Sequence, residues 1–282
     1  MDVAIITDEI SQDLAESLEV MQRHNVNQAE IRAIWGTNCV DLPDDDIARA
    51  RKMLDEAGMS VCGLASPFFK CDLDDNARAS RGMMHQAKDL TMADQPALLE
   101  RCFRVAEMMG TRNIRVFSFW RKSDPTDDIY NRIVDAFAQP LELAEKEGFR
   151  LLLENEHACF LGTGEETARV LKRIDSPALG LVWDPGNAFC GGENAYPDGY
   201  SHVKGRIDHI HIKDAIRHND GKVEFVRVGT GSIGFQDHID ALKADGYDGL
   251  LSLETHYALA EGGKLAASEE SMIALAKMVR GN

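Results

Sequence analysis

The chain has 282 residues, of which 44% are hydrophobic, and a formal net charge of −16 at pH 7. This length suits one large α/β domain with a sizeable core, and no apolar run approaches the about 18 residues of a membrane span. We therefore expect no membrane as a partner. Because an acidic chain repels a phosphate backbone, we expect no nucleic acid either.

The cysteines and the N-terminus indicate the compartment. The six cysteines are scattered, with no C-x-x-C pair, and a chain of this size needs no disulfide framework. The N-terminal run MDVAIITDEI has an acidic second residue and only a short apolar stretch, unlike a signal peptide. We therefore expect a cytoplasmic protein with reduced thiols.

Strand-like and helix-like segments alternate along the whole chain. Predicted strands, recognised as short apolar, β-branched runs, begin at Val3, Ala29, Ser60, Asn113, Arg150, Leu179, Ile207 and Leu250. The second of these runs is AEIRAI, residues 29–34, and the fourth is NIRVFSF, residues 113–119. Helical spacing is clear at 44–57, 97–109, 129–146 and 165–174. Glycines stand where a left-handed helix cap is expected, at Gly58, Gly110, Gly148 and Gly246.

Eight strand–helix units in this length favour a single-domain (β/α)8 TIM barrel over residues 1–282. The main alternative, a doubly wound dinucleotide-binding fold, needs G-x-G-x-x-G after its first strand, and the chain has TDEISQDL there. The least regular part is 67–95, after the third strand. It is either a lid over the barrel mouth or a solvated loop.

The last four predicted strands each end in a side chain that can bind a metal. These are Glu154 in LLLENEH, Asp184 in LVWDPGN, His211 in HIHIKDA and Glu254 in LSLETHY. Neighbouring parallel strands bring their C-terminal ends to one patch, where three carboxylates would repel one another unless a cation lay among them. One acid at a strand end is also typical of a loop start or a helix cap. Four together favour a metal.

Strand periodicity supports this interpretation. Successive side chains of a strand alternate between its two faces, so Leu152 shares a face with Glu154, and His209 with His211. The intervening leucines then face the helices. Three oxygen donors and one imidazole predict one divalent ion, with manganese expected and magnesium, cobalt or zinc as alternatives.

In this order, the motifs LLLENEH, WDPGNA, HIHIKDA and SLETH resemble the sugar phosphate isomerase/epimerase superfamily, the xylose-isomerase-like barrels. The resemblance implies that Glu154, Asp184, His211 and Glu254 are metal ligands. It further implies that Glu154 and Glu254 act as acid and base on opposite faces of a carbohydrate substrate. By the same resemblance, Arg217 matches an arginine that contacts substrate.

The chain departs from this family at several positions. Asn187 stands where epimerases and endonucleases of the fold carry a histidine. The stretches GLASPFF and VFSFW lack the histidines that the endonucleases use for a three-zinc cluster. An endonuclease is therefore disfavoured.

Further polar residues flank the predicted ligands. Glu156, His157 and His256, with Asn187, are candidates for contacting substrate hydroxyls, although loop polarity alone would explain them. Lys213 could bind a substrate oxygen or pair with an acid, and Asp214 could orient a neighbouring side chain. The glycine-rich run at 229–234 either binds phosphate or forms a turn in which Ser232 caps a helix.

The leading hypothesis is a metal-dependent isomerase or epimerase of a sugar or sugar-like ketose, with proton removal beside a polarised carbonyl and an enediolate intermediate. The same residues with a leaving hydroxyl would give an inosose-dehydratase-like lyase. A non-catalytic sugar-binding barrel is the alternative from another class, and a homo-oligomer is left open.

Overall fold

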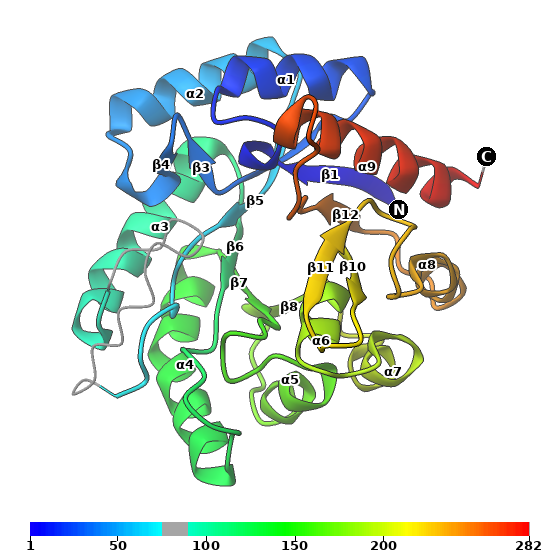
Figure 1. Ribbon diagram of the computed structural model, residues 1–282. Coiled ribbons are helices and arrows are strands. Elements are labelled where there is room, and N and C mark those ends of the chain that lie inside the picture. The colour runs from blue at the N-terminus through cyan, green and yellow to red at the C-terminus, as the bar shows by residue number, and fades with distance from the viewer. Residues whose placement is uncertain (75–89, 282) are drawn as a thin grey trace.

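The computed structural model describes residues 1–74 and 90–281, and within them parallel strands close into an eight-stranded barrel (Figure 1). In order of hydrogen bonding, the strands are β1 (Asp2–Ile6), β12 (Leu250–Leu253), β9 (His209–Ile212), β8 (Leu179–Trp183), β7 (Arg150–Glu154), β6 (Asn113–Val116), β5 (Ser60–Ala65) and β2 (Gln28–Ile31). The predicted single-domain TIM barrel is confirmed.

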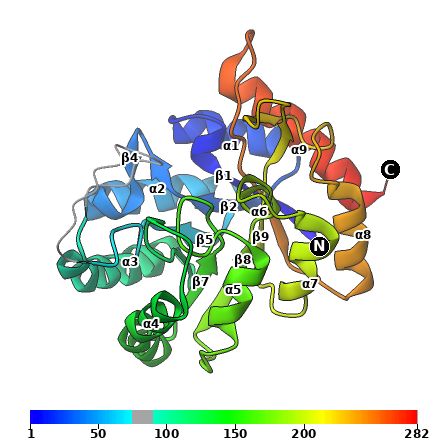
Figure 2. The same cartoon turned by 60° about the horizontal axis from the view of Figure 1, so that its bottom comes forward.

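The outer helices follow one another around the barrel in chain order (Figures 1 and 2). They are α1 (Leu14–Arg23), α2 (Asp44–Glu56), α3 (Gln95–Met109), α4 (Asp127–Glu147), α5 (Gly164–Leu171), α7 (Tyr200–Val203), α8 (Phe235–Ala244) and α9 (Gly263–Arg280). Gly110 and Gly148 cap α3 and α4 in the left-handed conformation, as predicted. Among the described residues, no helix combines the length and hydropathy needed to cross a bilayer.

Shorter helical segments lie in the connections. They are η1 (Thr7–Glu9), η2 (Cys39–Asp41), η4 (Met92–Asp94), α6 (Pro185–Cys190) and η5 (Ala195–Gly199). Of these, η1 and α6 directly follow the strands β1 and β8, so both lie at the end of the barrel where the strands finish. This end is called the mouth below.

The strand periodicity predicted which side chains pack outside the barrel. Leu151, Leu153, Leu251 and Leu253 are fully buried and belong to the large apolar core that the outer helices share. Glu154 follows Leu153 on the other face and is buried among polar groups instead. The alternation thus divides each strand between an apolar outer side and a polar interior near the mouth.

Two predicted strands end earlier than the sequence suggested. The strand expected to run from Ala29 to Ile34 leaves the barrel after Ile31, and β3 (Ala33–Ile34) pairs with β4 (Thr37–Asn38) in a separate hairpin. Trp35 and Gly36 form its turn with φ of 52° and 75°, the paired positive values of a tight hairpin turn. Likewise, β6 ends at Val116, because the amide of Phe117 bonds the carbonyl of Phe68 instead of continuing the ladder.

A second hairpin follows β9 and explains the glycine-rich run. Here β10 (Asp214–Arg217) pairs with β11 (Val223–Val226), and the Asp214 carboxylate accepts hydrogen bonds of 2.9 Å from the amides of Gly229 and Gly231. Those amides are thereby satisfied without phosphate. The prediction that Ser232 caps the next helix is wrong: α8 begins after Gly234, whose left-handed conformation makes the turn.

The 67–95 excursion falls mostly outside the described residues. Of this segment, the structure describes 67–74 and 90–95, and the proposed lid remains a prediction for the remainder.

Candidate active site

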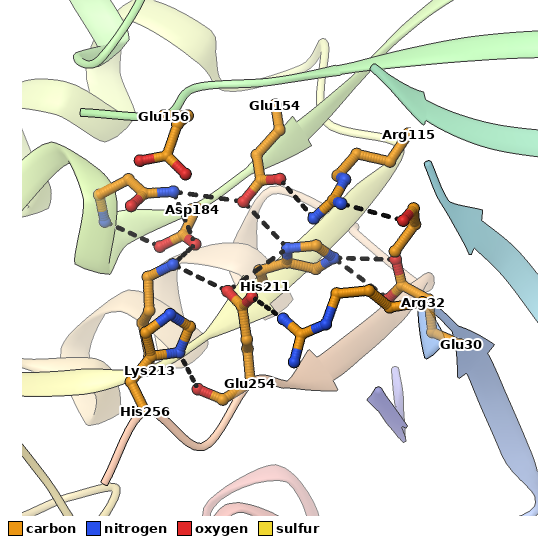
Figure 3. A network of polar contacts seen from close by, with 12 residues as sticks. Glu30, Arg32, Arg115, Glu154, Glu156, Asp184, His211, Lys213, Glu254 and His256 are labelled. Atoms are coloured by element: carbon orange, nitrogen blue, oxygen red, sulfur yellow. Dashed lines mark hydrogen bonds and ion pairs between the residues drawn. The ribbon is translucent and has the colours of Figure 1, made fainter. Parts of the chain in front are cut away.

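Four side chains converge at the mouth of the barrel. Glu154 ends β7, Asp184 and Glu254 directly follow β8 and β12, and His211 lies within β9. Each offers one ligand atom to a group whose atoms all lie within 4.8 Å of one another, and all four side chains are buried. Figure 3 shows Glu154 and Glu254 reaching this group from opposite sides.

Local structure fixes Asp184 in two ways. Its side chain caps α6, since Oδ1 accepts a hydrogen bond of 2.9 Å from the amide of Asn187. The side chain of Asn155 bonds both the amide and the carbonyl of Asp184, at 2.7 and 2.8 Å, and so joins the ends of β7 and β8. Asp184 is therefore a helix cap and a member of the cluster at once.

His211 has a carboxylate at each ring nitrogen. Nδ1 lies 3.1 Å from Oε1 of Glu154, and Nε2 lies 3.0 and 3.1 Å from the two oxygens of Glu30. Burial opposes protonation of His211, but these two carboxylates raise its pKa well above the ordinary value. Because a neutral imidazole donates only one hydrogen bond, this arrangement requires either a second proton or a cation at Nδ1.

Each glutamate of the cluster is held by a buried arginine. Arg115 Nη1 lies 3.1 Å from Oε2 of Glu154, and Arg32 Nη1 lies 2.8 Å from Oε1 of Glu254. Burial disfavours the charged forms, but His211 and Arg115 lower the pKa of Glu154. In the same way, Lys213 is the main influence that lowers the pKa of Glu254 well below its usual value. Both groups are therefore carboxylates at neutral pH.

Lys213 places an ammonium group inside the cluster. Its Nζ lies 2.7 Å from Oδ2 of Asp184 and 2.8 Å from Oε2 of Glu254. Even so, burial, together with the charges of Glu154 and Glu254, raises the pKa of Asp184 to about 7. Among the described residues, Lys213 is thus the cation that pairs with Asp184, and Asp184 shares it with Glu254.

The donor set fits a divalent cation. Three carboxylates and an imidazole are the ligands of a hard or borderline ion, and the carboxylate that faces each nitrogen of His211 favours a cation at Nδ1. The residues that would hold the ion are Glu154, Asp184, His211 and Glu254.

The predicted substrate-contacting residues fall into two groups. Asn187 donates to Glu154 at 3.2 Å and to Asp184 at 3.1 Å, and His157 lies 3.0 Å from Asn187 Oδ1 and 3.0 Å from Glu156. Glu156 is also paired with the buried Lys70 at 3.1 Å. These residues continue the cluster away from Glu254.

His256 and Arg217 are placed differently. His256 contributes to a smaller group with Glu9 and Glu254, and its Nδ1 lies 3.3 Å from the carbonyl of Glu254. Arg217 is exposed on the β10–β11 hairpin, where its guanidinium bonds the carbonyls of Phe189 and Gly221 at 2.6 and 3.2 Å. The structure therefore places His256 beside the cluster and Arg217 on the hairpin that borders α6.

A comparison with family models decides the classification. The model described as xylose isomerase-like TIM barrel matches residues 18–278. The chain belongs to this family. An uncharacterised protein of Methanocaldococcus jannaschii is 31% identical to this xylose isomerase-like barrel over 250 residues, which cover 87% of this chain and 80% of the relative.

Curated relatives with named activities are more distant. An inosose dehydratase of Geobacillus thermodenitrificans is 25% identical over 150 residues, and the match spans about half of each chain, 48% and 50%. Among solved structures, an L-ribulose 3-epimerase has a TM-score of 0.73 at 20% identity, covering 100% of this chain and 95% of its own. The IolI protein with a binding zinc atom has a TM-score of 0.76 at 18% identity, with 100% and 99% covered. Both structures share the fold.

Sequence reasoning missed the buried partners of this xylose isomerase-like site. Glu30 and Arg32 on and after β2, and Arg115 on β6, all contact the cluster, whereas the predicted ligands came from the last four strands alone. A signal was present in the sequence: AEIRA places two charged residues, and NIRVF one, within a predicted apolar strand. Such a residue belongs to the barrel interior, because the outer face packs against helices.

Proposed function

We propose that the protein is a divalent-metal-dependent isomerase or epimerase that acts on a sugar or sugar-like ketose. The observation that carries the proposal is the buried group of three carboxylates and one histidine at the mouth, with two of the carboxylates on opposite sides (Figure 3). Membership of the xylose isomerase-like family, whose fold is shared by ketose 3-epimerases, supports it.

In this proposal Glu154, Asp184, His211 and Glu254 hold one ion, with manganese expected and magnesium, cobalt or zinc as alternatives. The zinc atom named for the IolI structure supports a divalent metal. When bound, such an ion would polarise the carbonyl group of a substrate.

Glu154 and Glu254 are the proposed acid and base. Their lowered pKa values keep them ionised, so that either can accept the proton beside a substrate carbonyl. Epimerisation requires a proton to leave one face of a carbon and another to reach the opposite face. Two glutamates on opposite sides of one cluster suit that requirement, whereas binding alone needs no base.

The remaining polar residues would bind and orient the substrate. Asn187, His157, Glu156 and His256 lie at or next to the cluster and offer donors and acceptors for hydroxyl groups. Arg217 would have to release its two hydrogen bonds to backbone carbonyls before its guanidinium could contact a substrate. A small carbohydrate is the proposed partner.

A lyase that dehydrates an inosose is the second candidate. The curated relatives that carry a named activity support it, because they are inosose dehydratases. Dehydration needs one base and a proton for the departing hydroxyl group. In this second candidate function, the proposed donor of that proton is Lys213, whose ammonium pairs with both Asp184 and Glu254.

Solvent isotope exchange tests the proposal. Incubated in D₂O with manganese and a panel of ketoses and inososes, the protein should incorporate deuterium beside the carbonyl of its substrate. An epimeric product identifies the isomerase, and loss of water identifies the lyase. Tight binding of a panel member without exchange over hours would contradict catalysis and leave a sugar-binding barrel.

A further inference from the structure

A second group of potential ligands lies directly against the first, inside the barrel. Glu30, His209 and His211 have ligand-capable atoms within 4.8 Å of one another, and all three are buried. Glu30 comes from β2 and the histidines from β9, two strands that are not neighbours in the barrel. Glu30 therefore reaches across the barrel interior, as Figure 3 shows for Glu30 and His211.

The carboxylate of Glu30 is shared between two imidazole rings. Its Oε2 lies 3.0 Å from Nε2 of His209, and both its oxygens lie within 3.1 Å of Nε2 of His211. In the part of the chain that the structure describes, no arginine or lysine is paired with this side chain. Its partners are thus the proposed metal ligand and one other histidine.

The contact with Glu30 determines which nitrogen of His211 is available to a metal. A carboxylate only accepts hydrogen bonds, so Nε2, which faces Glu30, carries a proton. The Nδ1 lone pair of a neutral ring then points toward Oε1 of Glu154, 3.1 Å away, on the side of Asp184 and Glu254. That is the tautomer in which His211 can act as a ligand together with the three carboxylates.

We propose that Glu30 is a positioning residue that fixes the tautomer and ring orientation of His211 for metal binding, and that His209 in turn holds the carboxylate of Glu30. The proposal rests on the metal site proposed above and adds two residues to it. Neither residue contacts Asp184 or Glu254 directly in the described structure, so both act through His211.

The same three residues could instead hold a second ion. That arrangement would require His211 to bind metal through both nitrogens, which removes both ring protons, and would supply only three protein ligands. A hydrogen bond from Nε2 needs neither condition. Two ions bound per chain would overturn the proposal in favour of the second site.

The experiment is a calorimetric titration of Zn²⁺ into metal-free protein, comparing the wild type with Glu30→Gln. Glutamine keeps the size of the side chain but removes the charge from the acceptor, and partners of this kind typically contribute about 10–100-fold to metal affinity. We expect a loss in that range. His209→Gln retains a donor for Glu30 and should lose less than Glu30→Gln.

Asp208→Asn is the matched control. Asp208 directly precedes His209 at the start of β9, where its carboxylate bonds Arg150 at 2.6 Å and the amide of Leu181 at 3.0 Å. This variant also removes one carboxylate charge from the start of β9, but the hydrogen bonds of that carboxylate go to Arg150 and Leu181 and not to Glu30, His209 or His211. Its Zn²⁺ affinity should therefore remain that of the wild type. An equal loss in both variants would show a general effect on the barrel and overturn the positioning role.

Proton NMR supplies a readout that stability alone does not change. In the zinc-loaded wild type, the proton on Nε2 of His211 should be a slowly exchanging, downfield signal, and it should shift upfield in Glu30→Gln. Unchanged zinc affinity and an unchanged signal would overturn the role of Glu30 while leaving the metal site intact. Failure of the wild type to bind Zn²⁺ would instead refute the proposed metal site itself.

Discussion

Two buried histidines mark two differently built regions of this barrel. His238 on α8 packs in the layer outside the strands, where its Nε2 accepts a hydrogen bond of 3.1 Å from Trp183, and burial lowers its pKa to about 4. His211 lies at the mouth between carboxylates, which raise its pKa well above the ordinary value. Trp183 and Asp184 are consecutive in sequence, yet Trp183 bonds His238 in the outer layer and Asp184 belongs to the cluster at the mouth.

The comparison distinguishes packing that stabilises the fold from a charged cluster that serves a functional site. The outer layer buries neutral groups and aromatic rings, and the rings of buried Tyr200 and half-buried Tyr196 pack against His238. The mouth buries arginines, a lysine and carboxylates in contact with one another, an arrangement that well-packed apolar residues would often match or exceed in stability. Such a cluster is expected where the residues are required for the function of a site and not for the stability of the core.

The largest expected effect is loss of the metal. The purified protein should carry about one divalent ion per chain, because the described residues bring one group of four potential ligands together at the mouth. His211→Ala and Asp184→Ala should each lose it, whereas His238→Ala, in the outer layer, should retain it. Elemental analysis makes the measurement, and three zinc ions per chain would contradict a mononuclear site.

The second prediction distinguishes proton transfer from metal binding among the residues at the mouth. Glu154→Gln and Glu254→Gln keep the size of the side chain but remove the basic carboxylate, so each should reduce kcat by about 10²–10⁴-fold at saturating metal. Asp184→Asn should recover much of its activity there, because excess ion compensates for a weakened ligand. Steady-state assays over a metal titration provide the measurement.

Isotope exchange then refines the assignment of the two glutamates. If one glutamine variant still exchanges substrate hydrogen with solvent, that glutamate acts on the far face of the substrate. Full turnover in either variant would refute its role and direct attention to Glu156, His157 or His256.

The third prediction concerns the cation already present at the mouth. Lys213→Met leaves Asp184 and Glu254 without their shared ammonium, and breaking a buried ion pair from one side costs about 3–5 kcal/mol. We expect this loss of unfolding free energy in metal-free protein and a smaller loss with saturating Mn²⁺. Denaturant unfolding with chelator or with metal measures both.

Lys264→Met is the control for that experiment. Lys264 also pairs with a mouth carboxylate, Glu9, at 3.0 Å, but its side chain is 42% exposed. An exposed partner contributes at most about 1 kcal/mol, with or without metal. If Lys213→Met loses the same stability in chelator and in Mn²⁺, the lysine does not share charge compensation with the ion.

The smallest expected effect concerns the outer layer and pH. Because the folded pKa of His238 lies near 4 and the unfolded value near 6.5, its contribution to stability is complete above pH 6.5 and declines as pH falls toward 4. Between pH 7 and pH 5 this amounts to about 2 kcal/mol. His238→Gln still offers Trp183 an acceptor and should reduce the pH dependence of unfolding by that amount. If the free energy of unfolding has the same pH dependence in both proteins, the pKa of His238 is the same in the folded and unfolded states.

Local sequence patterns determined much of this protein. Strand–helix alternation predicted the closed barrel, and the two-residue period of the strands predicted that Glu154, Asp184, His211 and Glu254 would face one interior. The structure brings these four side chains together, while their role as ligands stays a prediction. Both inferences succeed because they depend on residues close in sequence and on the parallel arrangement that the fold imposes.

Only the tertiary structure decided how the charges at the mouth are paired. Arg32 contacts Glu254 across 222 positions of sequence, and Glu30 contacts His211 across 181. Sequence separations this large lie outside the range of any helix or strand periodicity. The sequence shows that β2 and β6 contain charged residues, which are unusual in apolar strands. Their partners can be identified only from the closed barrel. Closure fixes which strands face each other across the interior, and side-chain length and burial then select the pairs.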